Sequence, residues 1–201
     1  MTPFDPVDFP PEASHQAIGA EMTGPSTFTA AIALQEWIRD LIAGGFTEPQ
    51  RELRPFAAEQ RAFQVTDRAG LLLARAEYGS YWPTRTMLAP CRDEGWWVSC
   101  PGLIPAAAIL AAAASFRHAG PAAPARLEAA GWLRSTGRQD PNDPEPVSTW
   151  SLPNASRAAI RMDSGPDRGW LIYREAVASG RVISAALTTP PGVIAALALT
   201  D

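Results

Sequence analysis

The strongest constraint on the fold is that the second half of the sequence repeats landmarks of the first half at a nearly constant distance. Gly45-Phe46 corresponds to Gly131-Trp132, and the shift between matched landmarks stays between 85 and 88 residues along the chain. The other matches are Phe63 with Trp150, Leu71–Arg75 with Ala158–Met162, Trp82 with Trp170, Trp97 with Val182, Pro105 with Pro190, and Ile109 with Ile194. A period this long is not that of a solenoid. The sequence therefore predicts two tandem copies of one folded unit, separated by small loop insertions and deletions.

Hydrophobic spacing predicts that each unit runs helix, four strands, helix. Between Leu34 and Ile42 apolar side chains recur at the spacing of a helix with one buried stripe, and Gly44-Gly45 ends that helix. Short apolar segments separated by turn residues then indicate antiparallel strands. The predicted strands are Phe63–Thr66, Leu71–Arg75, Tyr81–Met87 and Trp96–Cys100, followed in the second unit by Thr149–Leu152, Ala158–Met162, Gly169–Glu175 and Val182–Leu187. The other predicted helices are Ala106–Phe116, Ala125–Ala130 and Pro190–Leu199.

The expected fold class is therefore α+β, with two tandem α-ββββ-α repeats. We expect antiparallel sheets with helices packed on one face, and halves related by a pseudo-two-fold axis. Repeat 1 is predicted over residues 25–118 and repeat 2 over residues 119–201. Residues 1–24 are rich in proline, a composition that favours an extended arm.

Composition and charge limit the kinds of partner that the chain is expected to bind. The chain has a formal net charge of −4. A mildly acidic chain is a poor generic binder of phosphate backbones, which are neutralised by clustered basic residues. The first residues lack the basic and apolar regions of a signal peptide. The most apolar stretch, Leu103–Phe116, is shorter than the roughly 18 residues of a membrane span and contains Pro105. We expect a cytoplasmic protein without membrane partners, either a monomer or a homodimer.

Two pairs of segments resemble a known family. The pieces GWWVSCPGLIPAAAILAAAASF and ISAALTTPPGVIAALALTD resemble the end of the actinobacterial SPDY-type repeat, domain-of-unknown-function family 317, in which a Trp-rich strand precedes an amphipathic helix. The pieces IAGGF and LEAAGWLRS resemble the helix end that opens the same repeat. The Ser-Pro-Asp turn itself is replaced by Val65-Thr66-Asp67-Arg68 and by Leu152-Pro153-Asn154-Ala155. The resemblance implies a tandem pair of repeats and an actinobacterial origin, and it implies no activity.

No segment has the pattern of a catalytic, metal or cofactor site. Cys91 with His118 is a conceivable nucleophile pair, but the sequence offers no third orienting group, so we assign no catalytic residue. The cysteines Cys91 and Cys100 form no disulfide framework, and with two distant histidines they lack zinc spacing. The acidic segment Asp140–Pro146 resembles a calcium loop only loosely, because three prolines interrupt it. Gly44-Gly45 ends a helix, whereas phosphate loops open one, so no cofactor is expected.

Aromatic residues on the predicted strands suggest a binding surface. Trp82 and Trp170 match each other across the repeats, which favours a core position for both. Successive strand residues point to opposite faces. With Trp97 and Val182 placed inward, Trp96 faces outward at the position that matches Arg181. The predicted binding patch consists of Trp96, Arg92, Arg85, Tyr78 and Arg181.

Two classes of function are compatible with these observations. The first is an uncharacterised, non-enzymatic binding or accessory module built on the duplicated scaffold, whose partner is either another protein or single-stranded nucleic acid. A positive face around Trp96 would favour nucleic acid, and a neutral apolar face would favour protein. The alternative is an enzyme of unrecognised type with a pocket between the repeats, for which Asp67, Asp93, Glu94 and His118 are the groups to inspect.

Overall fold

The fold is that of a computed structural model, which describes most of the chain from Thr27 to Thr200. The described residues are 27–47, 50–53, 60–79, 82–91, 95–116, 120–137, 147–153, 156–163, 168–174 and 182–200. The predicted arm, residues 1–24, lies outside them. No described helix is long and apolar enough to cross a membrane.

Four helices lie close to their predicted positions. They are α1 (Thr27–Ala43), α2 (Ala106–Phe116), α3 (Ala123–Ala129) and α4 (Pro191–Leu199). On α1 the predicted stripe is buried at Leu34, Trp37 and Leu41. The α4 helix is apolar on every side, and its residues from Gly192 to Ala198 are all buried. A helix without a polar face belongs inside a layer and not at its margin, and α4 indeed packs against both α2 and α3.

The strands form one continuous antiparallel sheet, which corrects the prediction of separate sheets for the two repeats. Within the described residues each half supplies five strands, one more than predicted. They are β1 (Gln50–Leu53), β2 (Gln60–Thr66), β3 (Leu72–Gly79), β4 (Trp82–Pro90), β5 (Val98–Pro101), β6 (Leu133–Gly137), β7 (Val147–Ser151), β8 (Ala158–Met162), β9 (Gly169–Tyr173) and β10 (Val182–Ala185). Their order across the sheet is β1-β2-β3-β4-β5-β10-β9-β8-β7-β6. The last strand of each half therefore meets the other at the centre.

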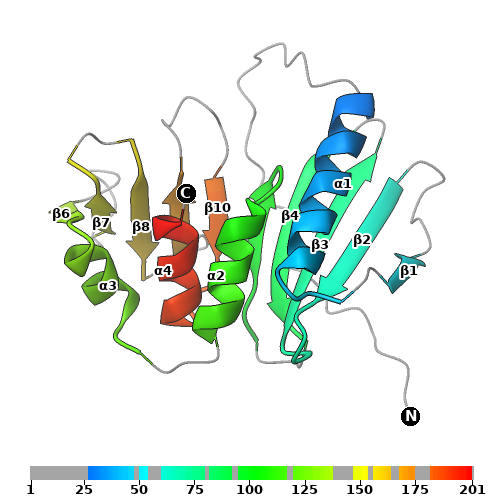
Figure 1. Ribbon diagram of the computed structural model, residues 1–201. Helices are drawn as coiled ribbons and strands as arrows, with labels where there is room; N and C mark the ends of the chain where they lie inside the picture. The colour runs from blue at the N-terminus through cyan, green and yellow to red at the C-terminus, as the bar shows by residue number, and fades with distance from the viewer. Residues whose placement is uncertain are drawn as a thin grey trace.

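All four helices lie on one face of the sheet, as predicted (Figure 1). The core lies between the two layers. Strand residues that point toward the helices are fully buried, as at Leu72, Ala74 and Ala76 on β3 and Ile172 on β9. Trp150 and Trp170 stack in this layer with ring centroids 5.6 Å apart. The core position predicted for Trp170 is confirmed. Trp82 begins β4, but its side chain lies outside the described residues.

The two halves meet where β5 pairs with β10 and α2 packs against α4; we call this junction the seam. In the sheet, Ser184 pairs with Ser99 and Ala185 with Val98. Beyond the paired strands, the amide of Ala186 donates to the carbonyl oxygen of Trp97 at 3.0 Å. In the helix layer, α2 and α4 approach so closely that a Cβ on Gly192 would lie 2.8 Å from a backbone oxygen of α2. A glycine at this position lets the two helices touch.

Candidate functional site

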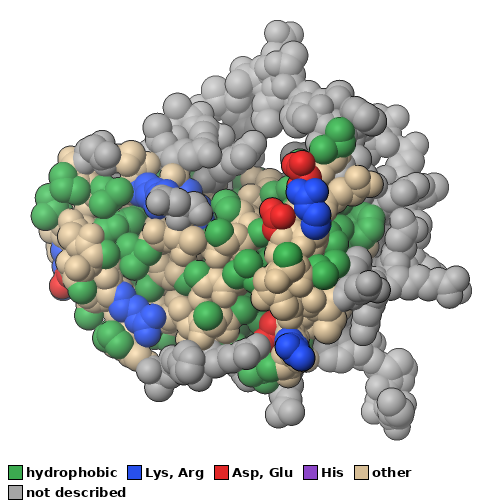
Figure 2. Space-filling model, in the orientation of Figure 1, with side chains coloured by type: hydrophobic (Ala, Val, Ile, Leu, Met, Phe, Trp, Pro, Cys, Tyr) green, Lys and Arg blue, Asp and Glu red, His purple; other side chains and the backbone are tan. Residues whose placement is uncertain are grey.

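The face of the sheet opposite the helices is not covered by any described helix (Figure 1); we call it the open face. Cross-strand pairing defines its central row, because residues paired directly in a sheet point to the same side. From β6 to β2 the row consists of Ser135, Thr149, Ile160, Leu171, Ser184, Ser99, Met87, Arg75 and Gln64. Figure 2 shows the opposite, helix-covered side, where charged side chains gather over α1 and are otherwise scattered.

In the second half of the chain the central row is aliphatic at two adjacent positions, Ile160 and Leu171, and it carries hydroxyl groups at its centre. Ile160 and Leu171 are half-buried, and neither belongs to the hydrophobic core under the helices. Ser99 and Ser184 sit at the seam. At the β6 margin, Leu133 is 61 % exposed, more than any other large hydrophobic residue described. The open face therefore mixes aliphatic and hydroxyl side chains.

Among the described residues, the charged side chains near the central row are Arg75, Glu77 and Arg85, all from the first half. Arg75 and Glu77 form an ion pair at 2.6 Å between Nη2 and Oε1. The Nε of Arg85 donates to the hydroxyl of Ser99 at 3.0 Å. Arg85 is the exposed member of this group. One anion balances one of the two cations, so the described part of the open face is close to neutral.

The structure does not bring the predicted binding patch together around an exposed tryptophan. Trp96 is only 4 % exposed, so the prediction that it faces outward is wrong. Its ring packs against Phe116 at the end of α2, 5.6 Å between centroids, and its Nε1 has no hydrogen-bond partner. Arg92 and Arg181 lie outside the described residues, as does the side chain of Tyr78 on β3. Of the predicted patch, Arg85 is therefore the residue placed at the surface.

The structure contradicts the predicted assignment of the two strand faces. Val182 pairs with Tyr173 on the open face, while Ile183 points inward and is buried. Trp97 precedes the buried Val98 and is half-buried, as expected of the opposite side. The prediction turned Trp96 outward because it matched Trp96 with Arg181, but the Trp96 ring packs under the helix layer against Phe116.

Of the four polar groups proposed for an enzyme, Asp67 is the one among the described residues, and it has a structural role. Asp67 is buried, and its Oδ1 accepts the amides of Leu71 at 2.6 Å and Leu72 at 2.9 Å, which fixes the β2–β3 turn. Asp93, Glu94 and His118 lie outside the described residues, as does the loosely calcium-like segment 140–146. Within the described residues no group of three or more His, Cys, Asp or Glu side chains is placed to hold a metal ion.

The environment of Cys91 disfavours its thiolate. Burial raises the pKa of the Cys91 thiol, and the negative charge of Asp67 raises it further. Because the thiolate is the nucleophilic form, this cysteine is poorly suited to attack a substrate at neutral pH. Cys100 is buried, and neither cysteine forms a disulfide.

We expect alkylation of Cys91 by iodoacetamide to be slower than that of an unstructured cysteine peptide at pH 8. The inflection of rate against pH should lie above that of the peptide, because the raised pKa reduces the thiolate fraction at each pH. Asp67→Asn keeps the oxygen acceptor and removes the charge, so it should move the inflection downward. The measurement is made in Cys100→Ser, which leaves one thiol. An inflection at or below that of the peptide would contradict the assignment.

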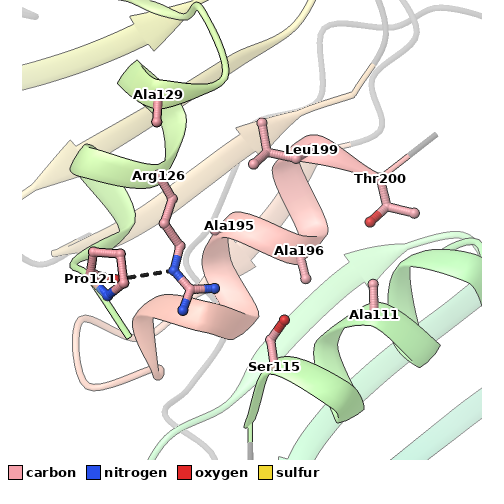
Figure 3. A pocket seen from close by; sticks show the side chains of 9 residues that line it. All are labelled: Ala111, Ser115, Pro121, Arg126, Ala129, Ala195, Ala196, Leu199 and Thr200. Carbon is pink, nitrogen blue, oxygen red and sulfur yellow. Dashed lines mark hydrogen bonds between the residues drawn. The ribbon is translucent and has the colours of Figure 1, made fainter. Parts of the chain in front are cut away.

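An open groove of about 490 Å³ lies on the helix-covered side between α2, α3 and α4. Its walls are mainly alanine and leucine, with Arg126, Ser115 and Thr200 as polar groups (Figure 3). The Nε of Arg126 donates to the carbonyl oxygen of Pro121 at 3.2 Å. The groove lies between the halves, where the enzyme hypothesis expects a pocket. Its described lining contains no carboxylate, histidine or cysteine that would activate the Ser115 hydroxyl.

Sequence reasoning missed the residues of the open face, although β9 carried a signal. Its run Gly-Trp-Leu-Ile-Tyr is apolar at adjacent positions instead of alternating. Strands that are apolar on both sides are typical of sheets buried on both faces. Trp170 and Ile172 fill the core, so Leu171 and Tyr173 give the other face its apolar character.

No protein-family model, curated protein or solved structure matches the chain. The fold and the open face define the protein as an α+β protein with a one-sided helical layer. The resemblance to the SPDY-type repeat stays a prediction from the sequence.

Proposed function

We propose that this chain is a non-enzymatic binding module, built from two copies of one α+β unit, whose open face binds another protein. The observation that carries the proposal is the central row, which has little net charge among its described residues, is aliphatic at Ile160 and Leu171 and bears hydroxyl groups at its centre. Apolar side chains grouped on a surface outside the core are typical of interaction sites. Because the unit is duplicated, the open face extends across the strands of both halves.

Several features support the duplication. Each half runs helix, five strands and helix, and the strand order is mirrored about the β5–β10 pair. The helices that follow the central strands begin at Ala106 and Pro191, 85 positions apart. The same shift relates Trp97 to Val182, which share the open side. A pseudo-two-fold axis through the seam between Ser99 and Ser184 accounts for this arrangement.

A protein partner fits the open face better than single-stranded nucleic acid does. Nucleic acid binding relies on a positive groove and on accessible rings for base stacking. Here the ion pair of Arg75 with Glu77 leaves little net charge, and the predicted stacking residue Trp96 is buried. A protein surface needs apolar contact area with a few satisfied polar groups, which this face offers.

The test uses matched arginine substitutions on the two sides of the molecule. Leu171→Arg places a charge in the open face, whereas Ile42→Arg places one on α1, where Ile42 is already 36 % exposed. In affinity capture from the native host, wild type and Ile42→Arg should retain the same protein, and Leu171→Arg should lose it. We expect the loss to be at least about tenfold, as for a charge introduced into the centre of an interface.

Nuclease and salt separate the two kinds of partner. A protein held by apolar contact should survive nuclease treatment and should change little as salt rises. Nucleic acid contacts weaken steeply with salt. Retention that requires intact nucleic acid would favour the nucleic acid hypothesis instead, and retention unchanged by Leu171→Arg would exclude the open face as the binding surface.

A further inference from the structure

The width of the open face restricts what can cover it. Strands spaced about 4.8 Å apart give the ten-stranded sheet a breadth of about 43 Å. An α-helix with its side chains is about 10 Å across, so one helix covers only about two strands. On the opposite side, the chain itself uses four helices for the same purpose (Figure 1). A partner that covers the open face must therefore be similarly broad.

A second copy of the chain presents a surface of matching breadth, namely its own open face. Two antiparallel sheets pack face to face at about 10 Å, with strand directions within about 30° of each other. Strands of about five residues give the face a footprint of about 700 Å² per copy. That area is close to the roughly 800 Å² that each partner buries in an interface of standard size.

Charge also permits this self-association. Two copies that meet through one surface bring identical charges toward each other, so a strongly charged face would repel itself. On the open face, Arg75 is paired with Glu77, and Arg85 is held by Ser99. In the central row, Met87 pairs with Arg75, whereas Ile160 and Leu171 lie on β8 and β9, away from these charges. Little like-charge repulsion therefore opposes contact between two open faces.

We propose that the protein bound by the open face is a second copy of this chain, giving a homodimer with the layers helix, sheet, sheet, helix. This proposal rests on the proposed function and names its partner. The interface is isologous, so each substitution acts twice in the dimer. A single arginine in the central row therefore places two charges between the sheets.

The test is sedimentation equilibrium of the purified full chain over a roughly thousandfold range of concentration. Wild type and Ile42→Arg should sediment as the same concentration-dependent dimer. Leu171→Arg and, independently, Ile160→Arg should raise the dissociation constant at least about 100-fold, because each buries an unpaired charge twice. Leu171→Ala, which adds no charge, should weaken the dimer by a smaller factor. Near-ultraviolet circular dichroism verifies that each variant keeps the native packing.

Two outcomes would overturn the proposal. A wild type that stays monomeric throughout the concentration range removes the homodimer, while capture that still depends on Leu171 would leave the proposed function standing. A dimer that both arginine variants preserve uses another surface.

Discussion

Replacing Trp150 with alanine is expected to lower the free energy of unfolding by about 3–5 kcal/mol, as for other large buried aromatics. Trp150 is 1 % exposed and stacks on Trp170. Its Nε1 donates to Oε1 of Glu128 on α3 at 3.0 Å, and the guanidinium of Arg134 lies 5.4 Å from its ring. The substitution removes packing between α3 and the sheet together with these polar contacts. Urea denaturation followed by tryptophan fluorescence and far-ultraviolet circular dichroism measures the change.

Leu133→Ala is the matched control for this substitution. Leu133 lies on the neighbouring strand β6 but is largely exposed, so its truncation should alter stability by only about 0.5 kcal/mol. Trp150→Phe keeps an aromatic ring and loses the N–H donor, and it should cost less than alanine. A loss below about 1.5 kcal/mol for Trp150→Ala would mean that the layer between α3 and the sheet is not a packed core.

Replacing Gly192 with valine is expected to destabilise the chain by about 3 kcal/mol through overpacking of the α2–α4 contact. A Cβ at this position would lie 2.8 Å from the carbonyl oxygen of Ser115 and 3.0 Å from its Cβ. The obstacle includes backbone, so relief requires the two helices to separate. The same denaturation experiment measures the loss, and a shift in melting temperature should accompany it.

Gly137→Val is the corresponding control, because a Cβ on Gly137 meets no atom within 4 Å. Valine is also well suited to a strand. We therefore expect Gly137→Val to be neutral within about 0.5 kcal/mol. Equal losses for Gly192→Val and Gly137→Val would indicate a general cost of replacing glycine and would contradict the close approach of α2 and α4.

The sequence predicted helices well because their signals are local. The stripe on α1 and the proline before α4 mark their elements without reference to the rest of the chain. The predicted bounds of α2, Ala106–Phe116, agree with the structure. Strand segments were found for the same reason, apart from β1 and β6, which are the outermost strands of the sheet. Edge strands are short and only partly buried, so their hydrophobic pattern is weak.

The joining of the halves and the identity of the open face were not predictable from local patterns. The β5–β10 pairing links residues about 85 positions apart, and nothing in Val98–Pro101 distinguishes an outer strand from a central one. Likewise, strand alternation separates Trp96 from Trp97 but does not say which side the helices cover. That choice depends on the packing of Trp96 against Phe116, a tertiary contact. Predicting Trp96 to face outward therefore placed the predicted binding patch on the wrong side of the strand.

Because the two halves belong to one chain, formation of the central β5–β10 seam does not depend on protein concentration. Either half alone would leave its seam strand, Val98–Pro101 or Val182–Ala185, as an unpaired edge, and would leave one side of α2 or α4 without its neighbour. Two such halves on separate chains would have to find each other in solution. Within one chain the connection between α2 and α3 holds them at an effective concentration in the millimolar range or above. The covalent link thus replaces an association equilibrium with a folding step. Residues of both halves then pack into one hydrophobic core between the helix layer and the sheet.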